Sequence, residues 1–378
     1  MCSSDLENIV VSASHSHSTP FLEHLTGPHP YLGFVKQQAV DAAVEACQMS
    51  RPARFGHAMM PVTGASFNTR APVSNGKCKF VRDFREGLTS TRPVDTRMNI
   101  VRIDDNAGRP IAGWIRFAAH PACVIFNTPI SAEYPGYLTD RLSETVAGGA
   151  PVFFGYGASG DVNCIPMFGQ ESDSEKLGHS LAHSAAPIFE RIKTQVPRRF
   201  LAGNRTIELP LDPVPTLQTL DKEIAEMAAF TSALDREPDL EWILGVNCKK
   251  EWTVEAKKSY VAPLAEWARL MKQAIHSGRT FPSIWPSRIT SWIVDDLGFV
   301  FYPGEPFAKL GLELNARSPL SETLVVAMSN GCDGYLGTDQ DRQDGGYEMY
   351  THPRYDKLAE DKRPLPYALG AGECFLQN

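Results

Sequence analysis

Short apolar runs rich in β-branched and aromatic residues recur along the chain, separated by longer stretches in which apolar residues return every three or four positions. The short runs have the composition of buried strands, and the longer stretches have the periodicity of helices that pack on one side. The predicted strands cover residues 8–11, 98–103, 111–119, 151–155, 289–294, 298–302 and 323–328, with further strand and loop over 54–75. The predicted helices cover residues 31–48, 137–146, 175–194, 217–234, 251–276 and 307–315.

The alternation of strands and helices predicts an α/β fold with a mixed or mainly parallel β-sheet core flanked by helices. Residues 209–283 differ, because two long charged amphipathic stretches follow one another there, joined by a loop near Pro238. We interpret this region as a helical insertion. The sequence contains no internal repeat, low-complexity tract or linker, so residues 1–378 are predicted to form a single domain.

Composition narrows the class of protein. The formal net charge is −7 and the pI is about 5.8, which argues against a nucleic-acid binder. No apolar run reaches membrane-spanning length. The eight cysteines are scattered without a Cys-x-x-Cys motif, which favours buried thiols in a reducing, cytoplasmic compartment over a thiolate zinc site.

The first residues contain neither the basic region nor the apolar core of a signal peptide. A predicted strand follows them almost at once, and an α/β fold seldom opens on a strand with so little chain before it. We therefore expect that the native N-terminus is truncated in this sequence.

Several predicted strands end on side chains that suit metal chemistry. The 8–11 run leads to His15 and His17, the 111–119 run to His120, and the 298–302 run to Glu305. Residues two apart in an extended backbone point the same way, so His15 and His17 can face one pocket. In open α/β sheets, pockets form beyond the carboxyl ends of strands. Two imidazoles and a carboxylate are the usual ligands of a catalytic Zn²⁺, and the spacing alone favours His17 among them.

Four segments in this order resemble the catalytic, N-terminal domain of neutral (non-lysosomal) ceramidases. They read SASHSHS at 12–18, FAAHP at 117–121, GDVN at 160–163, and YPGE at 302–305 with the later GY at 334–335 and GYE at 346–348. The resemblance implies one bound zinc ion whose ligands are His15, His120, Glu305 and Tyr335.

The same resemblance implies roles for residues beside the metal. It places His17 next to the ion in contact with substrate, and it gives Tyr347 a hydroxyl that hydrogen-bonds the developing oxyanion. An active-site arginine of the family corresponds to Arg70. Asp161 is expected to orient its loop rather than contact the metal.

One departure from the family concerns the residue after Gly-Asp-Val. Ceramidases have a serine there, whereas this chain has Asn163, which excludes a hydroxyl nucleophile at that place. The Asn163 amide can still donate a hydrogen bond to an oxyanion. The chain also ends without the C-terminal β-sandwich domain of true ceramidases.

The resulting hypothesis is a zinc-dependent hydrolase in which metal-activated water attacks the amide bond of a small N-acyl substrate, with lipids among the candidates. Two alternatives stay open: a catalytically impaired zinc-binding protein that recognises lipid or carbohydrate, and a metal-dependent esterase. His179 and His183, four apart on a predicted helix, do not change this view, because Ser180 stands where the His-Glu-x-x-His motif needs glutamate. The oligomeric state does not follow from the sequence.

Overall fold

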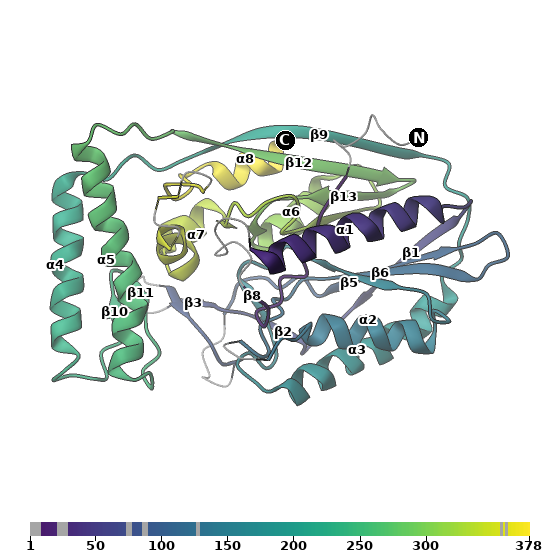
Figure 1. Ribbon diagram of the computed structural model, residues 1–378, viewed down its shortest axis with the longest axis horizontal. Helices are drawn as coiled ribbons and strands as arrows, with labels where there is room; N and C mark the ends of the chain where they lie inside the picture. The colour runs from purple at the N-terminus through teal and green to yellow at the C-terminus, as the bar shows by residue number, and fades with distance from the viewer. Residues whose placement is uncertain are drawn as a thin grey trace.

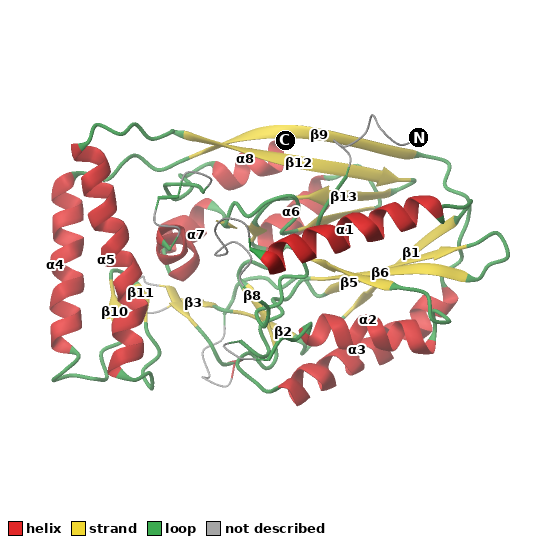
Figure 2. Ribbon diagram, viewed as in Figure 1, coloured by secondary structure: helices red, strands yellow, loops and turns green. Residues whose placement is uncertain are grey.

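Two four-stranded mixed sheets lie face to face at the centre of the computed structural model (Figures 1 and 2). The structure describes residues 9–20, 29–72, 78–84, 90–125, 129–355, 358–359 and 362–378. Helices cover the outer face of each sheet, so the layers run helix, sheet, sheet, helix. The predicted α/β class is confirmed, and both sheets combine parallel and antiparallel pairs.

The first sheet has the strand order β1-β5-β6-β7. Its strands are β1 (Arg54–Pro61), β5 (Arg97–Asp104), β6 (Pro110–Phe117) and β7 (Val152–Tyr156), and only β6 and β7 pair in parallel. Ile100 and its neighbours on one face pack against α2 (Glu133–Thr145) and α3 (Glu171–Arg191). Val101, the next residue along β5, faces the second sheet, as alternation in a strand requires.

The second sheet has the order β15-β13-β12-β9. Its strands are β9 (Phe200–Pro210), β12 (Ile284–Val294), β13 (Leu297–Phe301) and β15 (Glu322–Val326), and β13 and β15 are parallel. Its inner face meets the first sheet, where the Trp114 and Phe299 rings lie 5.4 Å apart. Its outer face packs against α6 (Ala308–Arg317) and α8 (Ala371–Gln377).

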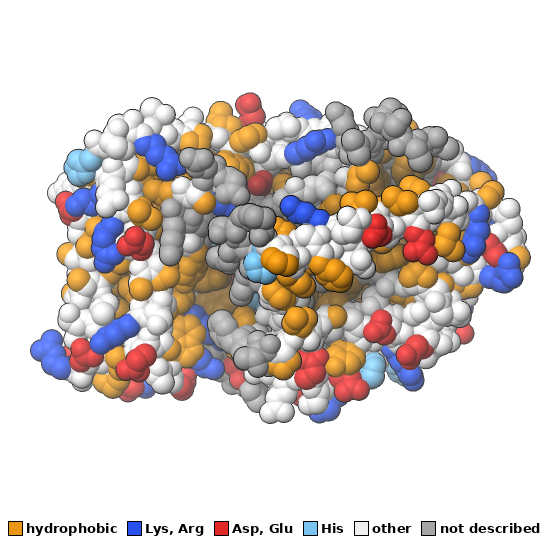
Figure 3. All heavy atoms as spheres, in the orientation of Figure 1, with side chains coloured by type: hydrophobic (Ala, Val, Ile, Leu, Met, Phe, Trp, Pro, Cys, Tyr) orange, Lys and Arg blue, Asp and Glu red, His pale blue; other side chains and the backbone are white. Residues whose placement is uncertain are grey.

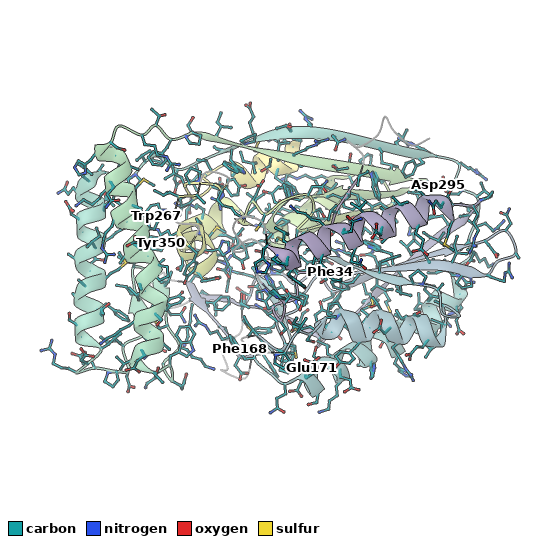
Figure 4. All side chains as sticks on the ribbon, viewed as in Figure 1. Phe34, Phe168, Glu171, Trp267, Asp295 and Tyr350 are labelled. Atoms are coloured by element: carbon teal, nitrogen blue, oxygen red, sulfur yellow. The ribbon has the colours of Figure 1, made fainter. Side chains whose placement is uncertain are left out.

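The predicted helical insertion extends from the end of a long β9–β12 ribbon (Figure 1). It contains α4 (Leu217–Ala233), α5 (Val254–His276) and a hairpin of β10 (Trp242–Ile243) and β11 (Val246–Asn247). The Thr216 and Thr253 side chains cap the two helices by accepting backbone N–H groups. The Arg354 guanidinium lies over the rings of Trp267 on α5 and Tyr350, which joins the insertion to the rest of the chain (Figure 4).

Short elements complete the fold around the ends of the main strands. They are β2 (Ser66–Asn68), β3 (Arg70–Pro72), β4 (Cys78–Phe80), β8 (Val162–Cys164), β14 (Glu305–Pro306), β16 (Tyr335–Leu336), α7 (Asp339–Asp344), a π-helical turn η4 (Tyr347–Thr351) and a 3-10 turn η5 (His352–Arg354). None of the described helices is both long enough and apolar enough to cross a membrane.

Two sequence-based expectations need correction. Residue 8 lies outside the described residues, and residues 9–11 form no strand, because Ile9 and Val11 are mostly exposed and only Ser12 makes a β-bridge, to Ser329. The predicted helix at 31–48 exists as α1 (Pro30–Gln48), but it has no buried residue. Its apolar side chains lie on the surface of the molecule (Figure 3).

Asp95 anchors a buried ion-pair group at the junction of the two sheets. Its carboxylate accepts hydrogen bonds from Arg97, at 2.8 and 2.9 Å, and from Arg116, at 2.7 Å. Arg116 on β6 also donates to the Val325 carbonyl of β15. Burial alone would raise the pKa of Asp95, but the two arginines outweigh it and hold that pKa well below its usual range.

We expect Asp95→Asn to lower the free energy of unfolding at pH 7 by about 3–5 kcal/mol, because it leaves a buried arginine without its counter-charge. The folded-state pKa is depressed, so the wild-type contribution is present at neutral pH and is lost as the pH falls below about 4. Urea unfolding between pH 3 and 7 measures both effects, with the exposed Asp140→Asn as a control. Equal stability of the Asp95 and Asp140 variants at pH 7 would contradict the prediction.

Candidate metal centre

The carboxyl ends of strands from both sheets meet at one place. His120 follows β6, Tyr156 ends β7 and Glu305 follows β13. The short strands β14 and β16 pair in parallel and set Glu305 opposite Tyr335. A Cβ on Gly160 would come within 2.5 Å of the Glu305 carbonyl oxygen and 3.0 Å of the Tyr335 ring, so only glycine permits this close approach.

The segment that carries His15 and His17 is held by loops rather than by a sheet. The Ala13 N–H donates to the Met328 carbonyl at 3.0 Å, and the His17 N–H donates to the Pro121 carbonyl at 3.0 Å. His15 adopts a left-handed backbone conformation with φ of 63°. Such a conformation is uncommon for a residue other than glycine and is found often at functional sites.

Three imidazoles and one carboxylate converge in this pocket. Ligand atoms of His15, His17 and His120 all lie within 4.8 Å of one another, and these residues could hold a metal ion. The Glu305 Oε2 atom lies 3.1 Å from His15 Nε2 and 2.9 Å from His120 Nε2. Two ligands at about 2.1 Å from a tetrahedral zinc are about 3.4 Å apart, so these separations fit a metal with small adjustments.

The three imidazoles each bring one nitrogen atom to the pocket. His120 Nδ1 lies 2.8 Å from the Ser159 carbonyl and 3.1 Å from the Val162 carbonyl, which assigns its proton to Nδ1 and leaves the Nε2 lone pair for a ligand. The Nε2 atom of His17 is buried without a hydrogen-bond partner, and that of His15 is buried with Glu305 Oε2 at 3.1 Å. Buried polar atoms are nearly always partnered, so this arrangement favours a bound ion.

Electrostatics within the pocket are strongly coupled. Burial lowers the pKa of His17, and the nearby His15 and His120 lower it further. Burial opposes the charged form of His120, but its contact with Glu305 outweighs this and raises its pKa. Burial would raise the pKa of Glu305, yet the two neighbouring imidazoles hold it well below its usual range.

Aromatic side chains form one wall of the site. The Tyr335 ring lies 6.4 Å from the His120 ring and 6.2 Å from that of Tyr347. Tyr347 is half-buried, packs 5.3 Å from Phe80, and has a pKa raised by burial, so its hydroxyl keeps its proton. The structure therefore places Tyr335 and Tyr347, the two tyrosines identified from the sequence, beside the imidazole cluster.

Asn163 also lies at this site. It pairs with His120 through a parallel β-bridge, is buried, and has a side-chain carbonyl oxygen without a partner. Asp161, in the same loop, accepts the Ala308 N–H at 2.8 Å and the Asn68 amide at 2.6 Å. These bonds fix the loop.

Arg70 occupies a different environment from the other selected residues. Its side chain is completely buried and forms an ion pair with Glu348, donates to the Gly345 carbonyl at 2.6 Å, and lies over the Phe307 ring. Burial alone would lower the pKa of Arg70, but Glu348 outweighs it and raises that pKa. The contacts of Arg70 with Gly345 and Glu348 thus stabilise the turn that precedes and includes Tyr347.

Sequence reasoning missed two residues at the site. Tyr156 stacks on the His15 ring with centroids 4.8 Å apart, and its hydroxyl lies 2.9 and 3.1 Å from the two His120 nitrogens. Its position at the end of a predicted strand was the signal that could have found it. Glu133 is a buried carboxylate that accepts the backbone N–H of His17, and burial raises its pKa to about 7. No local pattern identifies Glu133.

His179 and His183, in contrast, lie on the exposed side of α3, where His179 pairs with Glu175.

No known family model matches this sequence, and no curated protein matches it either. Solved structures do match it in three dimensions. The neutral ceramidase from Pseudomonas aeruginosa superposes with a TM-score of 0.60 at 15% identity, over 97% of this chain and 59% of that chain. A ceramidase complexed with C2 superposes with a TM-score of 0.58 at 14% identity, over 97% of this chain and 60% of that chain.

The chain therefore has a neutral-ceramidase-like fold, as the motifs predicted. It spans about three fifths of the length of the two ceramidase chains that it resembles. At this level of identity the likeness establishes the fold, and the chemistry has to be argued from the side chains.

Proposed function

We propose that the protein is a zinc-dependent hydrolase that cleaves the amide bond of small N-acyl substrates. The observation that carries the proposal is the convergence of His15, His120 and Glu305 from three distant segments, with Glu305 Oε2 at 3.1 Å from His15 Nε2 and 2.9 Å from His120 Nε2. The ceramidase-like fold supports an amide as the bond and a lipid-like molecule as the substrate class.

In this proposal His15, His120, Glu305 and Tyr335 hold one zinc ion. Zinc, when bound, lowers the pKa of a water molecule to about 7 and polarises a carbonyl group. The carbonyl groups of Ser159 and Val162 keep the His120 lone pair directed into the pocket. The pKa of His17 is low, so its imidazole remains neutral near pH 7. It can therefore contact substrate without placing a positive charge beside the zinc ion.

Two groups are proposed to stabilise the oxyanion that forms when the amide carbonyl is attacked. Tyr347 keeps its proton because burial raises its pKa, so its hydroxyl can donate. Asn163, whose backbone pairs with that of His120, is proposed to supply its side-chain amide as the second donor. Arg70 is proposed to help position the substrate through the Tyr347 turn, which it holds by its pair with Glu348.

Asn163 also supports a second candidate function. It stands where ceramidases have serine, and a chain that lost turnover with this serine would retain zinc and bind a lipid or carbohydrate without cleaving it. An esterase would use the same zinc and oxyanion donors on an easier bond. The three candidates differ in what they cleave, so a single panel of substrates separates them.

We expect the purified protein to contain one zinc per chain and to hydrolyse N-acyl substrates, ceramide analogues among them, faster than matched esters relative to the uncatalysed rates. A chelator should abolish this turnover, and zinc added back should restore it, with Mg²⁺ as the control ion. Mass-spectrometric metal analysis and release of the free amine measure the two properties. Turnover that persists in metal-free protein would contradict the mechanism, and zinc binding without turnover of any amide or ester would favour the recognition protein.

A further inference from the structure

The segment 9–20 carries His15 and His17 but belongs to no sheet. Residues 16–18 form hydrogen bonds with residues between 121 and 133. Ser16 Oγ donates to the Ser131 carbonyl at 2.8 Å, Ser18 Oγ donates to the Val124 carbonyl at 2.6 Å, and the Ser131 N–H donates to the Ser18 carbonyl at 2.9 Å. The position of the two imidazoles therefore depends on the segment just after His120.

Glu133, the first residue of α2, is the charged group in this set of contacts. Its Oε1 atom accepts the His17 N–H at 2.9 Å and lies 3.4 Å from Ser16 Oγ. Its Oε2 atom accepts the Val124 N–H at 3.1 Å. One buried carboxylate thus joins the backbone that holds His17 to the loop that follows His120.

We propose that Glu133 is a positioning residue that sets the His15–His17 segment against His120 and so determines the affinity of the metal site. This inference rests on the proposed zinc function, and it adds a residue that touches neither metal nor substrate. Partners of this kind, which orient ligand-bearing groups, typically contribute about 10–100-fold to metal affinity.

Two further observations support this role. Both His15 and Glu133 have left-handed backbone conformations, with φ of 63° and 51°, so each end of the connection is strained and has to be held by its surroundings. The ionised Glu133 carboxylate also offers only acceptors to the two N–H groups. Glutamine in its place would direct an amide N–H at one of these donors.

Glu133→Gln is the test. We expect its affinity for zinc, measured by competition with a chromogenic chelator, to fall about 10–100-fold, and the absorption spectrum of the Co²⁺-substituted protein to change. The matched control is Glu171→Gln. Glu171 accepts Ser131 Oγ at 2.7 Å from the neighbouring helix α3 but does not contact the histidine segment (Figure 4 labels it). This control should keep the wild-type zinc affinity.

Hydrogen exchange separates a failure of this inference from a failure of the proposed function. In metal-free protein, peptides covering 9–20 should exchange faster in Glu133→Gln than in the wild type or in Glu171→Gln. Ser16→Ala, which removes one anchor and leaves the carboxylate, should give a smaller effect in the same direction and serves if Glu133→Gln does not fold. Faster exchange in Glu133→Gln, combined with a wild type that binds no zinc, would retain the positioning role and reject the zinc enzyme. Unchanged exchange and zinc affinity in both variants would overturn the inference.

Discussion

His120→Ala is expected to remove the zinc and to lower turnover by at least about 10³-fold, because it deletes the ligand nearest to Glu305. A metal that polarises a carbonyl contributes several kcal/mol, and each 1.36 kcal/mol is a factor of ten in rate. The substitution also removes the imidazole contact of the Ser159 and Val162 carbonyls, which each keep a backbone N–H, so we expect the free energy of unfolding to fall by about 0.5–1.5 kcal/mol. Metal content, turnover and urea unfolding are the three measurements.

The matched control is His179→Ala, which removes an exposed imidazole from α3 and should change none of these properties. His17→Ala extends the comparison. It should retain the zinc if Tyr335 is the fourth ligand, as the ceramidase resemblance implies, and lose it if the imidazole cluster itself binds the ion. Zinc content and activity of His120→Ala equal to those of the wild type would remove the basis of the proposed site.

Tyr347→Phe is expected to lower kcat by about 10²–10³-fold, or about 2.7–4 kcal/mol, while the zinc remains bound. The reason is that the hydroxyl, which burial keeps protonated, is proposed to donate to the oxyanion only as that charge develops. KM for the N-acyl substrate should change much less than kcat. Steady-state kinetics with parallel metal analysis separates loss of the donor from loss of the ion.

Tyr137→Phe provides the control for this substitution. Tyr137 lies on α2, and its hydroxyl donates to Glu171, the first residue of α3. It is not part of the Tyr335–Tyr347 wall, so kcat and KM should be unaffected. If Tyr347→Phe left kcat unchanged, the oxyanion would have to be stabilised by Asn163 or the metal alone. The proposed role of Tyr347 would then be wrong.

The sequence was most informative where chemistry depends on residue type. A histidine pair, a further histidine at a strand end and a glutamate after a strand predicted the set that the structure brings together. The strands β5, β6, β13 and β15 and the helices α3, α4 and α5 lie close to their predicted ranges, because strong apolar periodicity marks them. The insertion between β9 and β12 followed from its change in charge and periodicity.

The errors have a common physical cause, which is that apolar character does not specify a partner. Residues 9–11 have the composition of a strand, but the β-bridge of this segment is made by the neighbouring Ser12, and Ile9 and Val11 remain exposed. The strand β9 was not predicted, since its formation depends on its long pairing with β12 rather than on its own pattern. The sequence also gave no indication that Arg70 would form an ion pair with Glu348, 278 positions away.

The sequence by itself determined which atoms are available for chemistry: the imidazoles, the carboxylate, the phenols, and an amide in place of a hydroxyl at position 163. Only the tertiary structure decided which of them face one another, which nitrogen of His120 lies beside Glu305, and that Glu133 accepts the His17 N–H. The reason is that the histidine segment is placed by backbone hydrogen bonds to distant parts of the chain, from Ala13 to Met328 and from His17 to Pro121, and such bonds can form between any residues whose backbones the fold brings into contact.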